Sequence, residues 1–145
     1  MFIAPNDIKS EIRKNYMGIY KTKVFSRWAN DEGISDLSLC AAVSEMLSGL
    51  IDADLDSGLI KKRIARTGQG KSGGFRTLVA TNKGDLWFFV FGFSKNEKSN
   101  IDKKEEKALK KLADQLLSMS LEDIAKAESK NELTKVNCNE EITNS

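Results

Sequence analysis

The spacing of apolar residues predicts four β-strands in the first two thirds of the chain. Alternation of apolar and polar residues, which is typical of strands, occurs at 19–25, 59–65 and 75–81. In the second of these segments, Lys61 and Arg63 fall on one face, opposite to two isoleucines. Lys62 points with the isoleucines and indicates an incompletely covered strand end. Residues 86–93 are apolar on both faces, which predicts the central strand of a sheet covered on both sides.

Helical spacing predicts four helices, each preceded by a polar capping residue. The expected N-caps are Ser26, Ser35, Asp102 and Ser120. Gly33 and Gly49 mark the expected ends of the first two helices. The third helix has an outer face of lysine and glutamate and an apolar stripe at Leu109, Leu112, Ala113, Leu116 and Leu117.

This order of elements predicts an α+β fold. We expect a small antiparallel or mixed β-sheet flanked by two N-terminal helices and by C-terminal helices. A length of 145 residues suits one domain, which we place at 18–119. Residues 1–17 are then an N-terminal arm or an upstream extension, and 120–145 are a C-terminal helix with a frayed tail from Lys135.

The net charge of +2 hides a strong segregation of charge along the chain. Residues 30–58 contain seven acidic groups and no basic one, whereas residues 59–98 contain nine basic groups and two acidic ones. Such asymmetry favours a polyanion on the basic side and a different partner on the acidic side. It is the first indication of a nucleic-acid-binding protein.

A glycine-rich loop at 66–74 lies inside the basic segment. Gly70-Lys71-Ser72 resembles the end of a P-loop, but Ala65 stands where that motif needs glycine, and a strand follows instead of a helix. We therefore expect no nucleotide triphosphatase. Glycine amides can still approach a phosphate closely, and Lys71 has Arg66 and Arg76 on either side of it.

Aromatic residues beside this cationic group offer one candidate for base stacking. Phe88, Phe89 and Phe91 belong to the central strand and are expected in the core. Phe93 adjoins the polar segment Ser94–Glu97, and we expect its ring to be available to a base.

The chain contains no histidine, which excludes Ser-His and Cys-His nucleophile pairs and a histidine general base. It has two cysteines, Cys40 and Cys138, far apart in the sequence and in no metal-binding spacing. We expect them to be free thiols in a reducing compartment, with Cys40 a small buried hydrophobe. No segment has the length of a membrane span, and the first residues do not resemble a signal peptide, so we expect a cytoplasmic protein without metal or cofactor.

Three segments together resemble a known family. The strings KKRIAR at 61–66, GQGKSGGFRT at 68–77 and FGFSKNEKSNI at 91–101 look like the toxin of RelE/ParE-type toxin–antitoxin pairs. Within that superfamily the chain is most similar to the RelE/HigB-like branch, and the resemblance extends over roughly 19–119. It implies a RelE-like toxin fold.

The resemblance also implies a function. Many such toxins enter the ribosomal A site and cut mRNA, so we expect a metal-independent endoribonuclease, an mRNA interferase that inhibits translation. A cognate antitoxin, which we expect to be of the helix-turn-helix type, would neutralise it, and the pair would bind operator DNA through the antitoxin. Ribosome and mRNA are the other expected partners. Two alternatives stay open: a ParE-like gyrase inhibitor and a non-catalytic RNA-binding module.

The candidate site follows from the basic residues and from the resemblance. The expected catalytic residues are Arg76, Lys71, Lys95 and Glu97. The expected RNA-binding residues are Lys61, Arg63, Arg66 and Phe93. Some ribosome-dependent relatives use a tyrosine near the C-terminus for proton transfer, but here the tyrosines are Tyr16 and Tyr20, and Asn96 stands where some relatives have arginine. The proton-transfer role is therefore open between Glu97 and a lysine.

Overall fold

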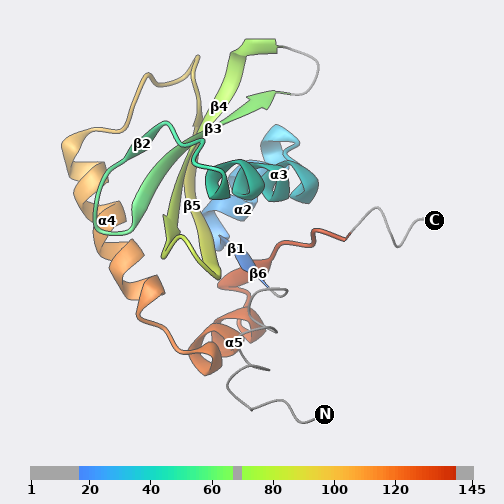
Figure 1. The fold of residues 1–145 in the computed structure, drawn as a ribbon, viewed down its shortest axis with the longest axis vertical. Helices are drawn as coiled ribbons and strands as arrows, with labels where there is room; N and C mark the ends of the chain where they lie inside the picture. Colours follow the sequence, from blue (N-terminus) through green and yellow to red (C-terminus); the bar gives the residue numbers. More distant parts are fainter. Residues whose placement is uncertain (1–16, 67–69, 140–145) are drawn as a thin grey trace.

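A six-stranded mixed sheet with helices on both faces forms the body of the protein (Figure 1). The computed structural model describes residues 17–66 and 70–139. The strands are β1 (Gly18–Thr22), β2 (Ala53–Asp54), β3 (Leu59–Arg66), β4 (Gly70–Thr81), β5 (Leu86–Ser94) and β6 (Leu133–Lys135). The helices are α2 (Lys23–Glu32), α3 (Asp36–Leu47), α4 (Lys103–Leu117) and α5 (Leu121–Ser129). This arrangement confirms the predicted α+β fold.

The strand order is β2-β3-β4-β5-β1-β6. β1 runs parallel to β5, and all the other neighbouring pairs are antiparallel. β5 lies between β4 and β1, and its side chains enter two separate cores. Phe89 packs with α2 and α3 on one face, whereas Phe88 packs with α4 and α5 on the other. The prediction of a central strand covered on both sides is therefore confirmed.

Helix starts follow the predicted caps in three of the four helices. The Ser35 hydroxyl accepts a hydrogen bond from the Ser38 amide, and both Asp102 and Ser120 form capping boxes. α2 differs, because its cap is Thr22, whose Oγ1 accepts a hydrogen bond from the Phe25 amide at 3.2 Å. The strand that we predicted to reach residue 25 thus ends at Thr22.

The segment after α5 is more ordered than predicted. β6 pairs with β1, and the Val136 amide donates to the Ile19 carbonyl at 2.8 Å. Leu133 and Val136 are buried. The expectation of a frayed tail from Lys135 is therefore wrong as far as residue 139, because pairing with a distant strand supplies the order that local sequence lacks. Residues 1–16 of the predicted arm at 1–17, and residues 140–145, lie outside the described residues.

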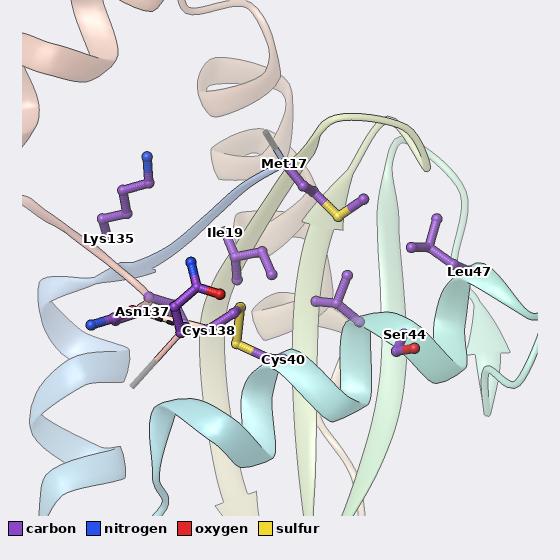
Figure 2. A pocket seen from close by; sticks show the side chains of 11 residues that line it. Met17, Ile19, Cys40, Ser44, Leu47, Lys135, Asn137 and Cys138 are labelled. Atoms are coloured by element: carbon purple, nitrogen blue, oxygen red, sulfur yellow. Dashed lines mark hydrogen bonds between the residues drawn. A yellow bond between two sulfur atoms is a disulfide. The ribbon is translucent and has the colours of Figure 1, made fainter. Parts of the chain in front are cut away.

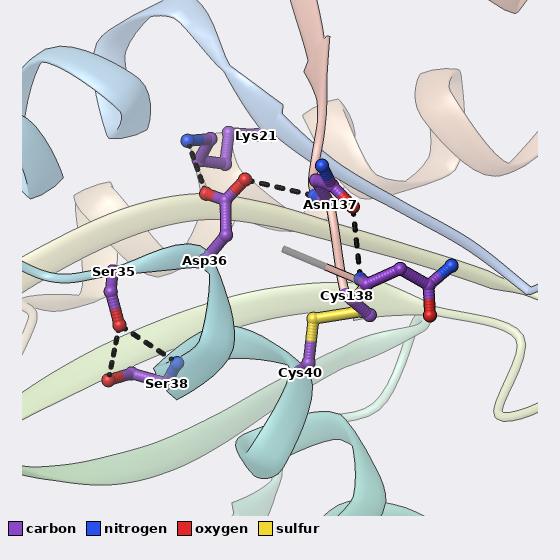
Figure 3. The surroundings of a disulfide bond; sticks show 8 residues. Lys21, Ser35, Asp36, Ser38, Cys40, Asn137 and Cys138 are labelled. Carbon is purple, nitrogen blue, oxygen red and sulfur yellow. Dashed lines mark hydrogen bonds and ion pairs between the residues drawn. A yellow bond between two sulfur atoms is a disulfide. The ribbon is translucent and has the colours of Figure 1, made fainter. Parts of the chain in front are cut away.

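Cys40 and Cys138 form a disulfide bond (Figure 3), so the prediction of two free thiols is wrong. The chain leaves β6 beside α3, which brings the two Cα atoms to 5.7 Å although the residues are 98 positions apart. Asp36, at the start of α3, joins the same contact. Its carboxylate accepts the Asn137 amide at 2.9 Å and Lys21 Nζ at 2.9 Å.

Lys62 is buried rather than placed at an open strand end. Its side chain is 7% exposed, and its Nζ lies 2.7 Å from Glu45 Oε1 and donates to the Leu50 carbonyl at 3.0 Å. Helix α3 and the segment after it supply both acceptors. Lys62 does depart from the alternation of β3, as the sequence indicated, but the physical reason is its buried ion pair with Glu45.

None of the helices in the described part of the chain is long and apolar enough to cross a bilayer.

Candidate nucleic-acid interface

Three cationic residues share one face of β3 and β4. Arg63 of β3 lies directly opposite Arg76 of β4, and Lys61 lies opposite Leu78. Leu78 is fully buried in the core beneath α4, which identifies the face. Because side chains alternate along a strand, Lys61, Arg63 and Arg76 all project on the side of the sheet that carries α4. The predicted alternation of Lys61 and Arg63 therefore puts them beside Arg76.

Arg76 contains a buried donor with nothing to bind. Its Nη1 atom is inaccessible to solvent and has no hydrogen-bond partner among the described residues. A buried donor that stays unpaired costs about 1–3 kcal/mol, and more when the group is charged. A planar guanidinium matches a phosphate or carboxylate with two parallel hydrogen bonds. Arg76 as a whole is partly exposed, so movement of its side chain would bring this atom to an anion that the described chain does not itself provide.

The loop between β5 and α4 is fastened at both ends beside this face. Lys61 Nζ donates to Asn100 Oδ1 at 3.2 Å, and that oxygen also accepts the Ile101 amide at 2.9 Å. Lys98 Nζ contacts both carboxylate oxygens of Glu105 at 2.6 Å. The hydrogen bond from Lys98 holds the pKa of Glu105 below its usual range, with help from the Asp102 amide. Asn100 was not predicted, and no motif in the sequence marks it.

Lys95 and Glu97 lie on the turn that follows β5. The Lys95 amide donates to the Gly74 carbonyl at 3.5 Å, which places the turn beside β4. Both side chains are exposed. The Ser94 hydroxyl donates to Glu97 Oε1 at 2.7 Å and fixes the carboxylate. The turn thus brings a cation and a carboxylate to the same end of the sheet as Arg76.

Phe93 does not offer the open ring that we predicted. It lies beside Arg76 in the register of β4 and β5, on the same face, but is only 4% exposed. Its ring packs 6.2 Å from that of Phe91 and belongs to the core beneath α4. A base therefore has no free face to stack on, and we exclude Phe93 from the proposed site. The bulge between Leu78 and Val79 turns both Val90 and Phe91 toward this core.

Arg66 and Lys71 lie in the outer part of the β3–β4 hairpin. The backbone pairs Arg66 with Gly70, so the hairpin continues beyond Arg63 and Arg76. Their side chains lie outside the described part of the structure, and their predicted roles stay predictions.

Within the residues described, no group of three or more Asp, Glu, Cys or His side chains could hold a metal ion.

The sheet topology and the cationic strand face define an α+β protein of the RelE-like toxin class. A family model described as the RelE toxin of the RelE/RelB toxin–antitoxin system matches residues 17–136. The chain therefore belongs to the RelE toxin family, as the sequence resemblance indicated. It is the toxin component of a toxin–antitoxin system, which implies a cognate antitoxin as partner. A comparison with curated protein sequences gives no match.

Proposed function

We propose that this toxin is a ribosome-dependent mRNA endonuclease, an mRNA interferase of the cytoplasm. The observation that carries the proposal is the buried, unpaired Nη1 of Arg76 opposite Arg63. An unpaired buried donor costs free energy, and Arg63 places a second cation directly across the strands. A polyanionic substrate would pair with the donor of Arg76, which supports RNA as the ligand.

The reaction that such a site can catalyse without metal is internal transesterification of RNA. The 2′-oxygen attacks the adjacent phosphorus, its proton passes to a base, and the bond from phosphorus to the 5′-oxygen breaks. An acid returns a proton to the departing 5′-oxygen. The products are a 2′,3′-cyclic phosphate and a 5′-hydroxyl. Cations around the phosphate stabilise the charge that develops on its oxygens in the transition state.

We assign catalytic and RNA-binding roles to these residues according to where they lie on β3, on β4 and on the turn after β5. Arg76, with Lys71, holds the scissile phosphate, and Lys61, Arg63 and Arg66 orient the RNA strand. Glu97 is suited to accept the 2′-proton, because its carboxylate is exposed and fixed by Ser94 at 2.7 Å. Lys95, exposed on the same turn, is suited to protonate the leaving oxygen. Both proton-transfer roles require a group within hydrogen-bond reach of the substrate.

Induced expression followed by primer extension on one abundant translated message tests the proposal. The wild-type chain should produce new 5′ ends inside the reading frame, and Arg76→Ala should produce none. Lys83→Ala is the matched control, because Lys83 lies on the turn before β5, at the far end of the sheet, and pairs with Asp54 at 2.6 Å. It should cut like the wild type.

Growth arrest without new RNA ends would overturn the endonuclease and direct attention to gyrase, whose supercoiling activity would then be assayed. Binding of RNA without cleavage would instead identify a non-catalytic RNA-binding module. Cleavage of the same RNA in the absence of ribosomes would remove ribosome dependence while leaving the nuclease intact.

The antitoxin that the family implies is proposed to be of the helix-turn-helix type and to connect the pair to its operator DNA. It would cover part of the cationic face or the acidic region 52–56. Co-purification with the product of the adjacent reading frame tests this pairing, and separate elution of the two proteins in gel filtration would contradict it.

A further inference from the structure

We propose that the Cys40–Cys138 pair is a reversible thiol–disulfide modification site that controls the attachment of residues 136–139 to α3. The site lies on the face of the sheet opposite the cationic surface, because α3 packs with Phe89 and not with Phe88. The inference is therefore independent of the proposed nuclease. Figure 3 shows the disulfide and the polar contacts around it.

Few contacts other than the disulfide hold this segment. The Val136 amide donates to Ile19 at 2.8 Å, and the Asn137 amide donates to Asp36 Oδ2 at 2.9 Å (Figure 3). The strand that precedes them, β6, has three residues. Val136 is buried, but Asn137 and Asn139 are exposed. The covalent bond is thus the strongest link between the end of the described chain and α3.

A small thiol can reach the sulfur atoms through a cavity. The cavity has a volume of about 540 Å³, and both cysteines line it together with Ile19, Val43 and Lys135 (Figure 2). This volume lies within the range of small-molecule sites. Both cysteines are also only partly buried. Glutathione, a tripeptide thiol, is the small thiol that we propose enters the cavity.

Reduction of the disulfide consumes two glutathione molecules, each of which supplies one thiol. One glutathione thiolate attacks a sulfur of the disulfide, forming a mixed disulfide and releasing the other cysteine as a thiolate, which takes up a proton. A second glutathione thiolate then attacks the mixed disulfide and releases the second cysteine. The protein gains two electrons and two protons, and one glutathione disulfide is formed. The reverse reaction closes the bond again.

Opening of this bond should leave the rest of the fold in place. Asp36 keeps its ion pair with Lys21, whose side chain is 10% exposed, so no buried charge loses its partner. β1 keeps its parallel pairing with β5 at four register positions. Departure of the segment frees the Ile19 carbonyl and uncovers the apolar side chains of Ile19 and Val43 that line the cavity.

Amide hydrogen exchange on the full chain tests the proposal. Incubation of the folded protein with glutathione should make both cysteines available to alkylation, as read by intact mass. Exchange at Val136 and Asn137 should then accelerate by about tenfold or more, while amides of β5, which open only with global unfolding, stay much better protected than these two. Cys138→Ser should exchange fast with or without glutathione. Ser44→Ala, which alters the same cavity without removing sulfur, should respond as the wild type does.

Three results would overturn the proposal. The disulfide could resist glutathione as long as the protein is folded, which would make it a purely structural bond. Val136 and Asn137 could stay equally protected after reduction, which would mean that the segment is held without the bond. Exchange in β5 that becomes as fast as exchange at Val136 and Asn137 would show global unfolding instead of a local release. None of these readouts depends on RNA cleavage, so failure here is distinguishable from failure of the proposed nuclease.

Discussion

Arg63 and Arg76 lie directly opposite each other on β3 and β4, on the face that carries α4. Like charges at opposed positions of neighbouring strands destabilise a sheet. Arg76 adds a buried Nη1 without a hydrogen-bond partner in the described structure. Neither feature helps the free protein to fold. Their presence at one position is the physical argument that this part of the sheet is arranged for an anionic ligand.

Replacing Arg76 by methionine should separate stability from function. Met keeps much of the aliphatic volume but removes the unpaired donor and the repulsion from Arg63. We expect the free energy of unfolding to rise by about 0.2–1 kcal/mol, while growth inhibition is lost. Urea denaturation and induced expression measure the two effects.

Thr77→Val provides the matched structural comparison. Thr77 is the next residue on β4, fully buried on the other face, and its hydroxyl donates to the Lys62 carbonyl at 2.8 Å. Its replacement should lower the free energy of unfolding by about 1 kcal/mol. If Arg76→Met destabilised the protein more than Thr77→Val does, Arg76 would be a structural residue.

Lys61 should contribute to RNA binding through charge rather than through sequence recognition. Release of counterions by each phosphate contact adds about 0.7 to the slope of log affinity against log salt for a single strand. Lys61→Gln should therefore reduce that slope by about 0.7 and weaken binding to different RNA sequences alike. Fluorescence anisotropy at several salt concentrations measures it. Lys83→Gln removes a lysine of the turn between β4 and β5 whose Nζ is already paired with Asp54 at 2.6 Å. It should leave the slope unchanged, and an equal reduction there would show that the binding is diffuse.

Much of the fold was predictable because its signals are local. The Ser35, Asp102 and Ser120 caps each act within three residues of sequence, and all three form as predicted. Alternation placed Lys61 and Arg63 on one face, and the structure places both there. The hydrophobic run of β5 is a local signal too. A strand buried on both faces has apolar residues at successive positions, and this run indicated the central strand.

The features that sequence reasoning missed depend on contacts between distant segments. Nothing near Cys138 indicates a partner 98 positions away, because the pairing of β6 with β1 is what brings it to Cys40. Lys62 looked like a gap in the strand pattern because Glu45, its ion-pair partner, belongs to another element. Phe93 is buried by α4, which begins ten residues later. In each case the tertiary neighbour decides the role of the residue.

Loss of the disulfide should lower global stability as well as release the C-terminal segment. The bond closes a loop between residues 98 positions apart, and cross-links of that span stabilise by about 4–5 kcal/mol through the entropy of the unfolded chain. Urea unfolding of the oxidised wild type and of the Cys40→Ser/Cys138→Ser double variant should differ by this amount. Wild type in excess reductant should match the double variant. A persistent difference between those two would mean that serine itself perturbs the site.

Acid should weaken the attachment of the loop that holds Asn100. The hydrogen bond from Lys98 lowers the pKa of Glu105 below its usual range, so folding favours the carboxylate. A group with a lowered folded-state pKa stabilises the protein above its ordinary pKa, and this contribution is lost as pH falls through the lowered value. The free energy of unfolding should therefore decline as the pH falls below 4.5, the ordinary pKa of Glu. Glu105→Gln should show a smaller decline over that acid range in urea titrations at several pH values. Parallel curves for the two proteins would exclude a contribution from Glu105.

The ion pair of Lys62 should show an asymmetry between its two partners. Lys62 is 7% exposed and Glu45 is 53% exposed, so replacing the carboxylate by an amide leaves a buried ammonium with neutral acceptors, the Gln oxygen and the Leu50 carbonyl. Glu45→Gln should therefore cost about 1–3 kcal/mol. Lys62→Met removes the buried charge itself and places an apolar chain of similar length between α3 and the sheet. Its free energy of unfolding should stay within about 1 kcal/mol of the wild type or rise. Combining the two substitutions completes a double-mutant cycle, in which the cost of Glu45→Gln should disappear once Lys62 is methionine. If that cost persisted, Glu45 would stabilise α3 by some means other than Lys62.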